Sequence, residues 1–232
     1  MQKKRKPSKD FRELPVYGVT EAARYLHMSS ATLRTWVLGR RYSSSEGEKF
    51  SPPVIHLPDA TDRRLSFSNL VEAHVLHALR TDHRLSMPAV RRALDYAEQE
   101  FDIERLLLRK EILTTPGDLF LEQYGQLISL SRSGQLAIRK LLEGHLQRIN
   151  RDVEGLPIRL YPVLPSQGVH GSRTVVIDPR LSYGRPVLES RGVSTSVLTD
   201  RLDAGESVED LAADYDLERA EVEEAILYER AA

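Results

Sequence analysis

The sequence predicts a mainly α-helical protein with small β elements. Three observations lead to this fold class. Two short helices joined by a tight turn fit residues 16–38, two longer amphipathic segments follow between residues 69 and 101, and three short amphipathic segments lie between residues 195 and 230. The β candidates are short and far apart, so no large sheet is expected.

The composition narrows the class of protein. The 232 residues suffice for more than one hydrophobic core. The chain contains no cysteine, which excludes disulfides, thiolate metal sites and cysteine nucleophiles and fits a cytoplasmic location. No apolar run reaches the length of a membrane span, and the basic N-terminus lacks the apolar stretch of a signal peptide. We therefore expect no membrane contact.

Charge is distributed unevenly along the chain. Residues 1–92 carry a net charge of +8, residues 93–199 are neutral, and residues 200–232 carry −9. A cationic segment attracts a polyanion, whereas an anionic segment is repelled by it. The front of the chain is therefore suited to nucleic acid and the rear is not.

Residues 1–15 are a charged tail, and the next residues have the pattern of a helix-turn-helix. The first helix is expected over Thr20–His27. The second, capped by Ser29 or Ser30, ends at Gly39, a natural helix stop. Its buried face consists of three residues, Leu33, Trp36 and Val37.

A two-stranded wing is expected to follow within residues 40–67. The two β candidates are Val54–Leu57 and Leu65–Phe67, joined by residues 58–62, and the segment is basic at both ends. Two amphipathic helices then complete a unit over residues 16–101: Asn69–Arg80, capped by Ser68, and Met87–Phe101, capped by Ser86.

Residues 102–165 are interpreted as a small α+β middle domain. Its expected elements are strands at Leu106–Leu113, Leu119–Leu121 and Leu127–Leu130, turns at Pro116-Gly117 and Tyr124-Gly125, a helix at Gln135–Ile149 and a last strand at Ile158–Val163.

Residues 166–173 form a linker, and residues 174–232 a C-terminal domain. A hairpin is expected between Thr174–Ile177 and Arg185–Leu188. Three helices should follow, at Thr195–Ala204, at Val208–Tyr215 with Ser207 as its cap, and at Glu218–Arg230. Their expected core is Leu198, Leu202, Val208, Leu211, Leu217, Val222, Ile226 and Leu227.

The front unit resembles the DNA-binding domain of the MerR family. The stretch from Tyr17 to Leu26, the Thr32-Leu33-Arg34 core of the second helix and the stretch Arg63–Leu70 carry the resemblance, which covers residues 16–101. It implies a winged helix-turn-helix that binds DNA as a two-fold dimer. The wing loop is longer and richer in proline than the family pattern, and the lack of cysteine excludes the metal-responsive branch.

The rear unit resembles a small bacterial domain of unknown function found in VapB-like antitoxins. This resemblance is carried by Thr174–Pro179, Gly184–Leu188, Gly205–Tyr215 and Val222–Tyr228. It implies a homeodomain-like three-helix fold behind a hairpin, and a PIN-like ribonuclease toxin as partner. The Gly-Thr-Arg that commonly precedes the first helix of that family reads Glu189-Ser190-Arg191 here, so only Arg191 is retained.

The candidate DNA contacts lie on the second helix and in the wing. A helix fits the major groove, and the side chains that are not buried point at the DNA. The candidates are Ser30, Thr32, Arg34 and Thr35 on the helix, Arg40 and Arg41 near the phosphate backbone, and Arg63 and Arg64 on the wing.

The three-helix topology of the C-terminal unit is typical of DNA-binding domains, but its charge of −9 opposes DNA binding. We give the charge more weight and assign this unit to protein contacts. Binding to DNA depends on cations that release counterions, and the three helices offer only Arg201, Arg219 and Arg230. The toxin could be held by guanidinium groups that pair with its active-site carboxylates. The candidates for that role are Arg180, Arg185 and Arg191.

The sequence contains no motif that indicates catalysis, a metal or a cofactor. His74 and His77 are three residues apart but lack an obvious third ligand, and the nucleotide, metalloprotease and serine-hydrolase motifs are absent. The sequence therefore predicts a non-enzymatic, dimeric antitoxin that represses its own operon. The alternative is a MerR-like regulator that senses a small molecule through its middle domain, and a hydrolase with unrecognised carboxylates is the remaining class.

Overall fold

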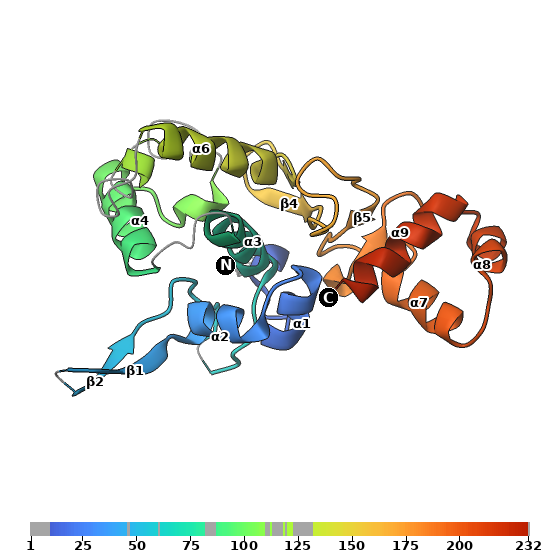
Figure 1. The fold of residues 1–232 in the computed structure, drawn as a ribbon, viewed down its shortest axis with the longest axis horizontal. Coiled ribbons are helices and arrows are strands. Elements are labelled where there is room, and N and C mark those ends of the chain that lie inside the picture. The colour runs from blue at the N-terminus through green and yellow to red at the C-terminus, as the bar shows by residue number, and fades with distance from the viewer. Residues whose placement is uncertain are drawn as a thin grey trace, which may run out of the picture.

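The computed structural model describes residues 10–45, 47–59, 61–81, 87–109, 112, 118, 120–122 and 132–231. Figure 1 shows an elongated molecule with a two-stranded wing, β1–β2, projecting at one end and three C-terminal helices at the other. Helices predominate and the sheets are small and antiparallel, so the predicted fold class is confirmed. The cap at Ser86, the strand Leu127–Leu130 and the turns Pro116-Gly117 and Tyr124-Gly125 lie outside the described residues.

The predicted helix-turn-helix is confirmed. Helix α1 covers Val19–Tyr25 and α2 covers Ser30–Leu38. At the start of α1 the Glu21 carboxylate accepts the Gly18 N–H, which satisfies one of the free amides of the first turn. Leu33, Trp36 and Val37 are buried, as their spacing predicts.

The wing exists, but the sequence assignment of its strands is wrong. Strand β1 covers Arg40–Ser44 and pairs with β2 over Gly47–Ser51. The segment Val54–Leu57 is not a strand, because the N–H groups of Val54 and Ile55 donate to the carbonyl of Trp36 at the end of α2. Leu65 forms a single bridge with Tyr17, and Phe67 begins the next helix. Both true strands are polar and exposed, so they carry no apolar pattern that would predict them.

Two long helices support the wing and the recognition helix. Helix α4 covers Met87–Phe101, as predicted. Helix α3 covers Phe67–Thr81 and begins earlier than expected, because Ser66 rather than Ser68 caps it. The Asn69 N–H donates to Ser66 Oγ at 3.2 Å, and the Ser66 N–H donates to Asn69 Oδ1 at 3.1 Å.

The middle segment shares its core with the helix-turn-helix. Helix α6 (Arg132–Leu146) packs on α3, and strands β3 (Ile149–Arg151) and β4 (Pro157–Leu160) form a bulged pair beside it. One cluster of buried side chains extends from Tyr17 through α3, α4 and α6 to Ile177. Middle residues thus fill the space behind α1 and α2.

Two strands predicted in the middle segment are wrong where the structure describes them. Leu106–Leu108 forms a 3-10 helix, η2, and Phe120 and Leu121 are helical. All three leucines of η2 are buried. A continuous run of buried apolar residues fits a strand and a tight helical turn equally well, so periodicity could not separate them.

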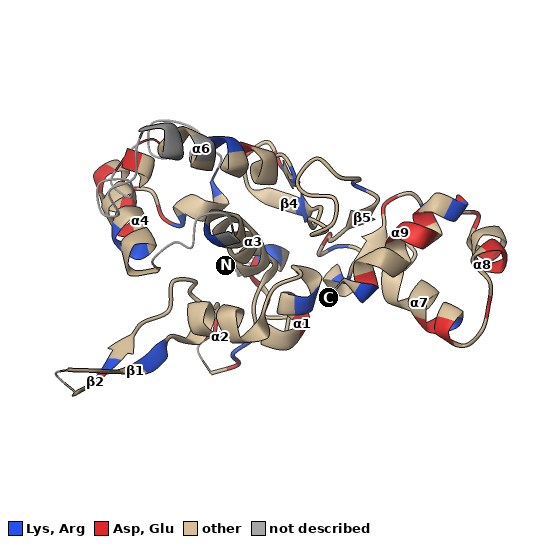
Figure 2. Ribbon diagram, in the orientation of Figure 1, with Lys and Arg blue, Asp and Glu red and all other residues tan. Residues whose placement is uncertain are grey.

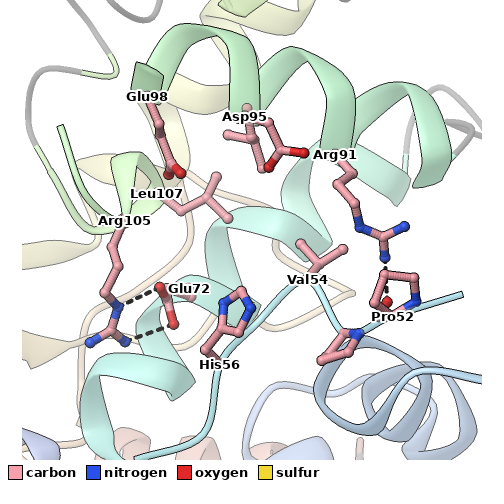
Figure 3. A pocket seen from close by; sticks show the side chains of 11 residues that line it. Pro52, Val54, His56, Glu72, Arg91, Asp95, Glu98, Arg105 and Leu107 are labelled. Carbon is pink, nitrogen blue, oxygen red and sulfur yellow. Dashed lines mark hydrogen bonds and ion pairs between the residues drawn. The ribbon is translucent and has the colours of Figure 1, made fainter. Parts of the chain in front are cut away.

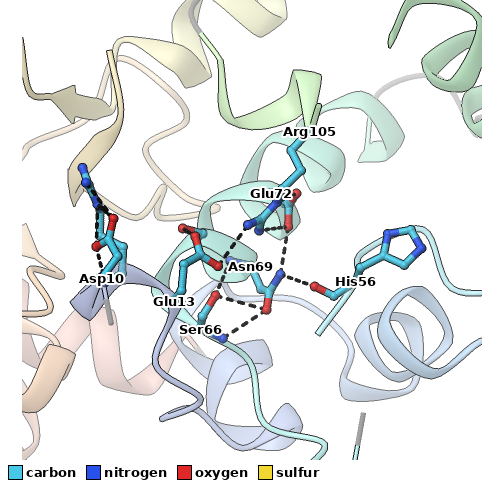
Figure 4. Close-up of polar contacts among 9 residues, drawn as sticks. Asp10, Glu13, His56, Ser66, Asn69, Glu72 and Arg105 are labelled. Atoms are coloured by element: carbon cyan, nitrogen blue, oxygen red, sulfur yellow. Dashed lines mark hydrogen bonds and ion pairs between the residues drawn. The ribbon is translucent and has the colours of Figure 1, made fainter. Parts of the chain in front are cut away.

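An ion network around the buried Glu72 joins the N-terminal arm, α3 and η2 (Figure 4). Arg105 donates to both oxygens of Glu72 at 2.8 Å and to Glu13 at 3.0 Å. Glu72 is only 5% exposed and also accepts from Asn69 Nδ2 at 2.9 Å. Glu13 belongs to the short 3-10 helix η1 (Phe11–Glu13), so this part of the charged tail is packed against the body.

The C-terminal unit has the predicted architecture. Strands β5 (Val175–Val176) and β6 (Val187–Leu188) pair in front of three helices, α7 (Thr195–Asp203), α8 (Val208–Tyr215) and α9 (Arg219–Arg230). Ser207 Oγ accepts the Asp210 N–H at 3.1 Å, which confirms the predicted cap. Of the predicted core, only Leu227 is wrong: it is 55% exposed.

Helix α9 packs its last turn against the helix-turn-helix. Tyr228, 2% exposed, donates its hydroxyl hydrogen to the Tyr25 carbonyl at 2.9 Å. Its ring meets the His27 ring edge-on, with centroids 4.7 Å apart. His27 is in the turn between α1 and α2 with φ +50°. The C-terminal unit therefore contacts the turn that orients the recognition helix.

The contact between α3 and α6 makes stability sensitive to acid. His74 Nε2 lies 3.3 Å from His145 Nδ1, and burial lowers the pKa of His145 to about 4 and that of His74 well below its ordinary value. Their neutral forms are thus favoured in the folded state, whereas the unfolded chain takes up protons below about pH 6.5.

The contribution of the two neutral histidines to the free energy of unfolding should consequently be fully present above about pH 6.5 and be lost as the pH falls toward 4. At pH 5 the loss from His145 alone is about 2 kcal/mol relative to pH 7, measured by urea unfolding at both values. The variant His145→Gln should show a smaller loss between these pH values than the unchanged chain. Equal losses in the two proteins would contradict this origin.

Candidate nucleic-acid and partner interfaces

A groove lies between the recognition helix, the wing and the neighbouring helices. Its volume is about 630 Å³. None of the described residues that line it is acidic; they are Ala31, Thr32, Thr35 and Trp36 of α2, Arg40, Tyr42 and Ser51 of the wing, Val54, Arg80 of α3, and Met87, Pro88 and Arg91 of α4. A described lining with three arginines and no carboxylate favours an anionic occupant.

The pairing of the wing gives it two different faces. Cross-strand partners share a face, so Arg40 lies with Ser51 and Tyr42 with Lys49 on the face toward the groove. The opposite face carries Arg41 and Phe50, and there Arg41 is paired with Glu48 at 3.1 Å. The groove face therefore presents Arg40, whereas Arg41 on the outer face is paired with Glu48 within the hairpin.

Two further arginines close the groove from behind. The Arg80 guanidinium lies over the Trp36 ring, 6.0 Å from its centroid. Arg91 donates to the Pro52 carbonyl at 2.5 Å, which ties the base of the wing to α4. Both arginines sit on amphipathic helices, where a cation is most often an ordinary solvated residue, so no sequence signal singles them out.

Gly39 is the single residue that connects the end of α2 to the first strand of the wing. Its φ of +71° is unfavourable for residues with a side chain, and a Cβ there would lie 2.6 Å from the Phe50 ring. The glycine therefore lets the chain turn directly from recognition helix to wing, which fixes Arg40 beside Thr35.

The predicted DNA contacts are only partly brought together. Thr32, Thr35 and Arg40 line the groove, and Ser30 and Arg34 are exposed on α2 outside its lining. Arg41 is on the outer face of the wing.

Arg63 and Arg64 are not on the wing, contrary to the prediction. Arg63 lines a separate hollow beside Leu38 with φ +53°, and Arg64 is paired with both oxygens of Asp62. The prediction for Arg63 and Arg64 is wrong because the true wing strands lie earlier in the chain, between residues 40 and 51.

The charge contrast between the two ends is visible in the fold (Figure 2). The ribbon is red for acidic residues over parts of α7, α8 and α9, and blue for basic residues in the wing. Within residues 191–231 every arginine has an acidic partner: Arg191 pairs with Asp216, Arg201 with Glu206 and Asp214, Arg219 with Glu209 and Glu223, and Arg230 with Asp203. This unit thus offers a phosphate no uncommitted arginine.

The three arginines predicted to contact the toxin lie in two different parts of the C-terminal unit. Arg180 is held by the buried Asp178, with guanidinium-to-carboxylate distances of 3.1 Å, and remains half exposed. Arg185 is exposed and has no ion-pair partner among the described residues. Arg191, by contrast, reaches Asp216 at the end of α8. Only Arg180 and Arg185 therefore share a loop.

A smaller cavity of about 260 Å³ lies between α3, α4 and the segment after the wing (Figure 3). Leu94, Leu107 and Val54 give it apolar walls. Glu98 faces it, and burial raises the pKa of this carboxyl group, while the Leu106 N–H donates to it at 2.7 Å. Arg91 lines both this cavity and the groove, so the two hollows share a wall.

The described ranges carry neither a metal-binding cluster nor a membrane span. No group of three or more histidines and carboxylates there could hold a metal ion. Within the same ranges no helix is long and apolar enough to cross a membrane.

Comparison with known families finds two domains. Residues 15–94 match a family described as "Putative DNA-binding HTH domain", and residues 175–228 match one described as "Protein of unknown function (DUF433)". The two matches coincide with the helix-turn-helix, wing and α3 on one side and the hairpin with α7–α9 on the other.

Two proteins of Mycobacterium tuberculosis resemble the whole chain. One, named "Putative antitoxin VapB45", is 29% identical over 230 residues, covering 92% of this chain and 93% of the relative. The other, Rv2308, is 24% identical over 221 residues, covering 92% of this chain and 89% of the relative. The predicted resemblance to VapB-like antitoxins with an N-terminal helix-turn-helix is confirmed.

The fold has a counterpart among solved structures. The crystal structure of Rv2018 from Mycobacterium tuberculosis superposes with a TM-score of 0.66 at 23% identity and covers 92% of this chain and 97% of that one. The order of winged helix-turn-helix, middle segment and three-helix unit is therefore a shared architecture.

Proposed function

We propose that the protein is the antitoxin of a type II toxin–antitoxin pair, a non-enzymatic cytoplasmic protein that binds its own operator DNA and neutralises a PIN-like ribonuclease toxin. The observation that supports DNA binding is the groove between α2 and the wing, whose described lining carries three arginines and no acidic residue. The likeness to the protein named "Putative antitoxin VapB45" supports the toxin half.

On DNA, α2 would enter the major groove with Ser30, Thr32, Arg34 and Thr35, and the wing would hold the adjacent backbone through Arg40. Arg41, Arg63 and Arg64 would contribute less, because two of them are paired with carboxylates and none lines the groove. A MerR-like homodimer would place two such units on a palindromic operator.

Replacing Arg40 by alanine should weaken binding to the upstream DNA about tenfold and lower the slope of log affinity against log salt by about 1, since one phosphate contact is lost. Arg41→Ala is the matched control: the neighbouring arginine has the same charge but lies on the outer face, paired with Glu48. Fluorescence anisotropy over a salt series measures both. Equal effects of the two substitutions would show that the groove face is not the DNA face.

In the toxin-neutralising part of this proposal, the C-terminal unit binds the protein partner. The arginines of its three helices are committed to carboxylates of the same helical unit, so the surface of α7–α9 is anionic and unsuited to DNA. Co-expression of the chain with the product of the adjacent reading frame tests this half. A stable complex with suppressed ribonuclease activity is expected, and a partner that neither binds nor is inhibited would refute it.

The cavity beside α4 favours a second candidate, a regulator that senses a small molecule. Occupancy there would act on Arg91 and through it on the base of the wing. A ligand-dependent rise in melting temperature that is lost in Glu98→Gln but kept in Glu100→Gln would support sensing. If no compound in a ligand library changes the melting temperature while partner binding is intact, the sensing function is refuted and the antitoxin function stands.

A further inference from the structure

Tyr183 is the most exposed tyrosine among the described residues. Its exposure is 91%, and it stands in the short 3-10 turn η4 (Ser182–Gly184), just before β6. No hydrogen bond or ring contact within the described chain involves it. An aromatic ring left entirely in water contributes nothing to the hydrophobic stabilisation of the fold.

The backbone at this position is unfavourable for a tyrosine. Ser182, Tyr183 and Gly184 are successive left-handed residues, with φ of +46°, +57° and +76°. A side chain in this conformation is disfavoured, and glycine or asparagine would fit without that cost. Tyr183 therefore imposes strain on the fold and gains no internal contact in return, a combination typical of residues that act on something outside the chain.

The turn is nevertheless rigidly held. Asp178, 1% exposed, accepts the Arg180 N–H at 2.9 Å and the side chain of Arg159 at 3.0 Å. At the other end, Gly184 lies directly against the buried Tyr17 side chain. A ring displayed on a fixed turn loses little freedom when it is bound, so the surface is preorganised.

The turn that holds Tyr183 carries apolar and cationic side chains. Leu181 is 38% exposed, and Phe11, 37% exposed, lies under the Arg180 guanidinium at 5.9 Å. Arg185 follows two residues later; it is exposed and lines a hollow that also contains Glu21 and Glu229. Asp178 is the only acidic residue between positions 178 and 188, and it is buried and paired. Tyrosine and arginine are the residues that dominate protein–protein binding energy.

We propose that the turn Arg180–Arg185 is the principal toxin-binding surface and that Tyr183 is its anchor, inserted into an apolar pocket with an acidic rim on the partner. This inference rests on the proposed antitoxin function and names the surface that performs it. Arg180 and Arg185 would pair with the carboxylates of that rim, while Leu181 and Phe11 would exclude water around the ring.

The decisive variant is Tyr183→Gly, compared by titration calorimetry against the protein encoded by the adjacent reading frame. Binding should weaken at least about 30-fold, the effect of losing a binding hot spot. The melting temperature should stay unchanged or rise by up to about 2–4 °C, because glycine relieves the left-handed backbone. Tyr183→Phe, which keeps the ring, should bind nearly normally.

Asp102→Gly is the matched control. Asp102 is exposed at the end of α4 with φ +50°, so glycine relieves the same backbone conformation at a site away from the turn. It should leave the affinity unchanged. Full binding by Tyr183→Gly, or a clear drop in its melting temperature, would overturn the inference while leaving the antitoxin function standing. Failure of the unchanged chain to bind would refute that function itself.

Discussion

Replacing Arg105 by alanine is expected to lower the free energy of unfolding by about 3 kcal/mol. Arg105 is the cationic partner of Glu72, which is 5% exposed and would be left as a buried charge with only the Asn69 amide as donor. Breaking such a pair costs about 3–5 kcal/mol, and the partial exposure of the guanidinium places the effect at the lower end. The loss would be read from urea unfolding followed by circular dichroism.

A matched substitution and a double variant sharpen this prediction. Arg92→Ala removes an exposed arginine of α4 and should change stability by less than about 0.5 kcal/mol. Glu72→Gln in the Arg105→Ala background removes the stranded charge, so the double variant should be more stable than Arg105→Ala alone. A loss below about 1 kcal/mol for Arg105→Ala would show that water screens the pair as it does a surface salt bridge.

The second large effect is expected from Gly184→Ala, at about 2–4 kcal/mol. A methyl group there would overlap the Tyr17 hydroxyl oxygen and lie 3.0 Å from Tyr17 Cζ, and the φ of +76° adds backbone strain. Tyr17 is buried between α1 and the C-terminal unit, so the damage falls on their junction. Thermal unfolding should record a fall of about 4–16 °C.

The Tyr17→Phe variant separates the two causes. The Tyr17 hydroxyl is buried and finds no hydrogen-bond partner in the described part of the chain, so its removal alone should be neutral or stabilising. In the Tyr17→Phe background, Gly184→Ala should cost less, because the closest atom is gone and only the backbone strain persists. An unchanged cost would mean that the overlap with Tyr17 is not the source.

Much of the fold could be predicted because local signals agreed with tertiary structure. The helix-turn-helix and the three C-terminal helices have caps such as Ser207 and stops such as Gly39 at the positions where the structure ends them. Leu227 was the exception within α9: its spacing fits the core, but the neighbouring Tyr228 takes the buried position against Tyr25. That choice depends on a surface far away in sequence.

The wing and the groove could be predicted only in part. Strands with no buried face, such as Arg40–Ser44, lack the alternation that identifies a strand, whereas Val54 and Ile55 are apolar yet serve to cap α2. Thr32, Thr35 and Arg40 were predictable because a helix-turn-helix presents its second helix, and the residues just after it, to DNA. Arg80 and Arg91 reach the groove from helices that have no such expected role.

The contact between Tyr228 and Tyr25 joins residues 203 positions apart. At synthesis rates of about 5–20 residues per second, helix α1 waits roughly 10–40 s for the helix that covers it. During that interval the Tyr25 and His27 face of the nascent chain is open to solvent and to chaperones. The order of translation thus leaves the first helix of the helix-turn-helix without this contact until the ribosome has passed residue 228.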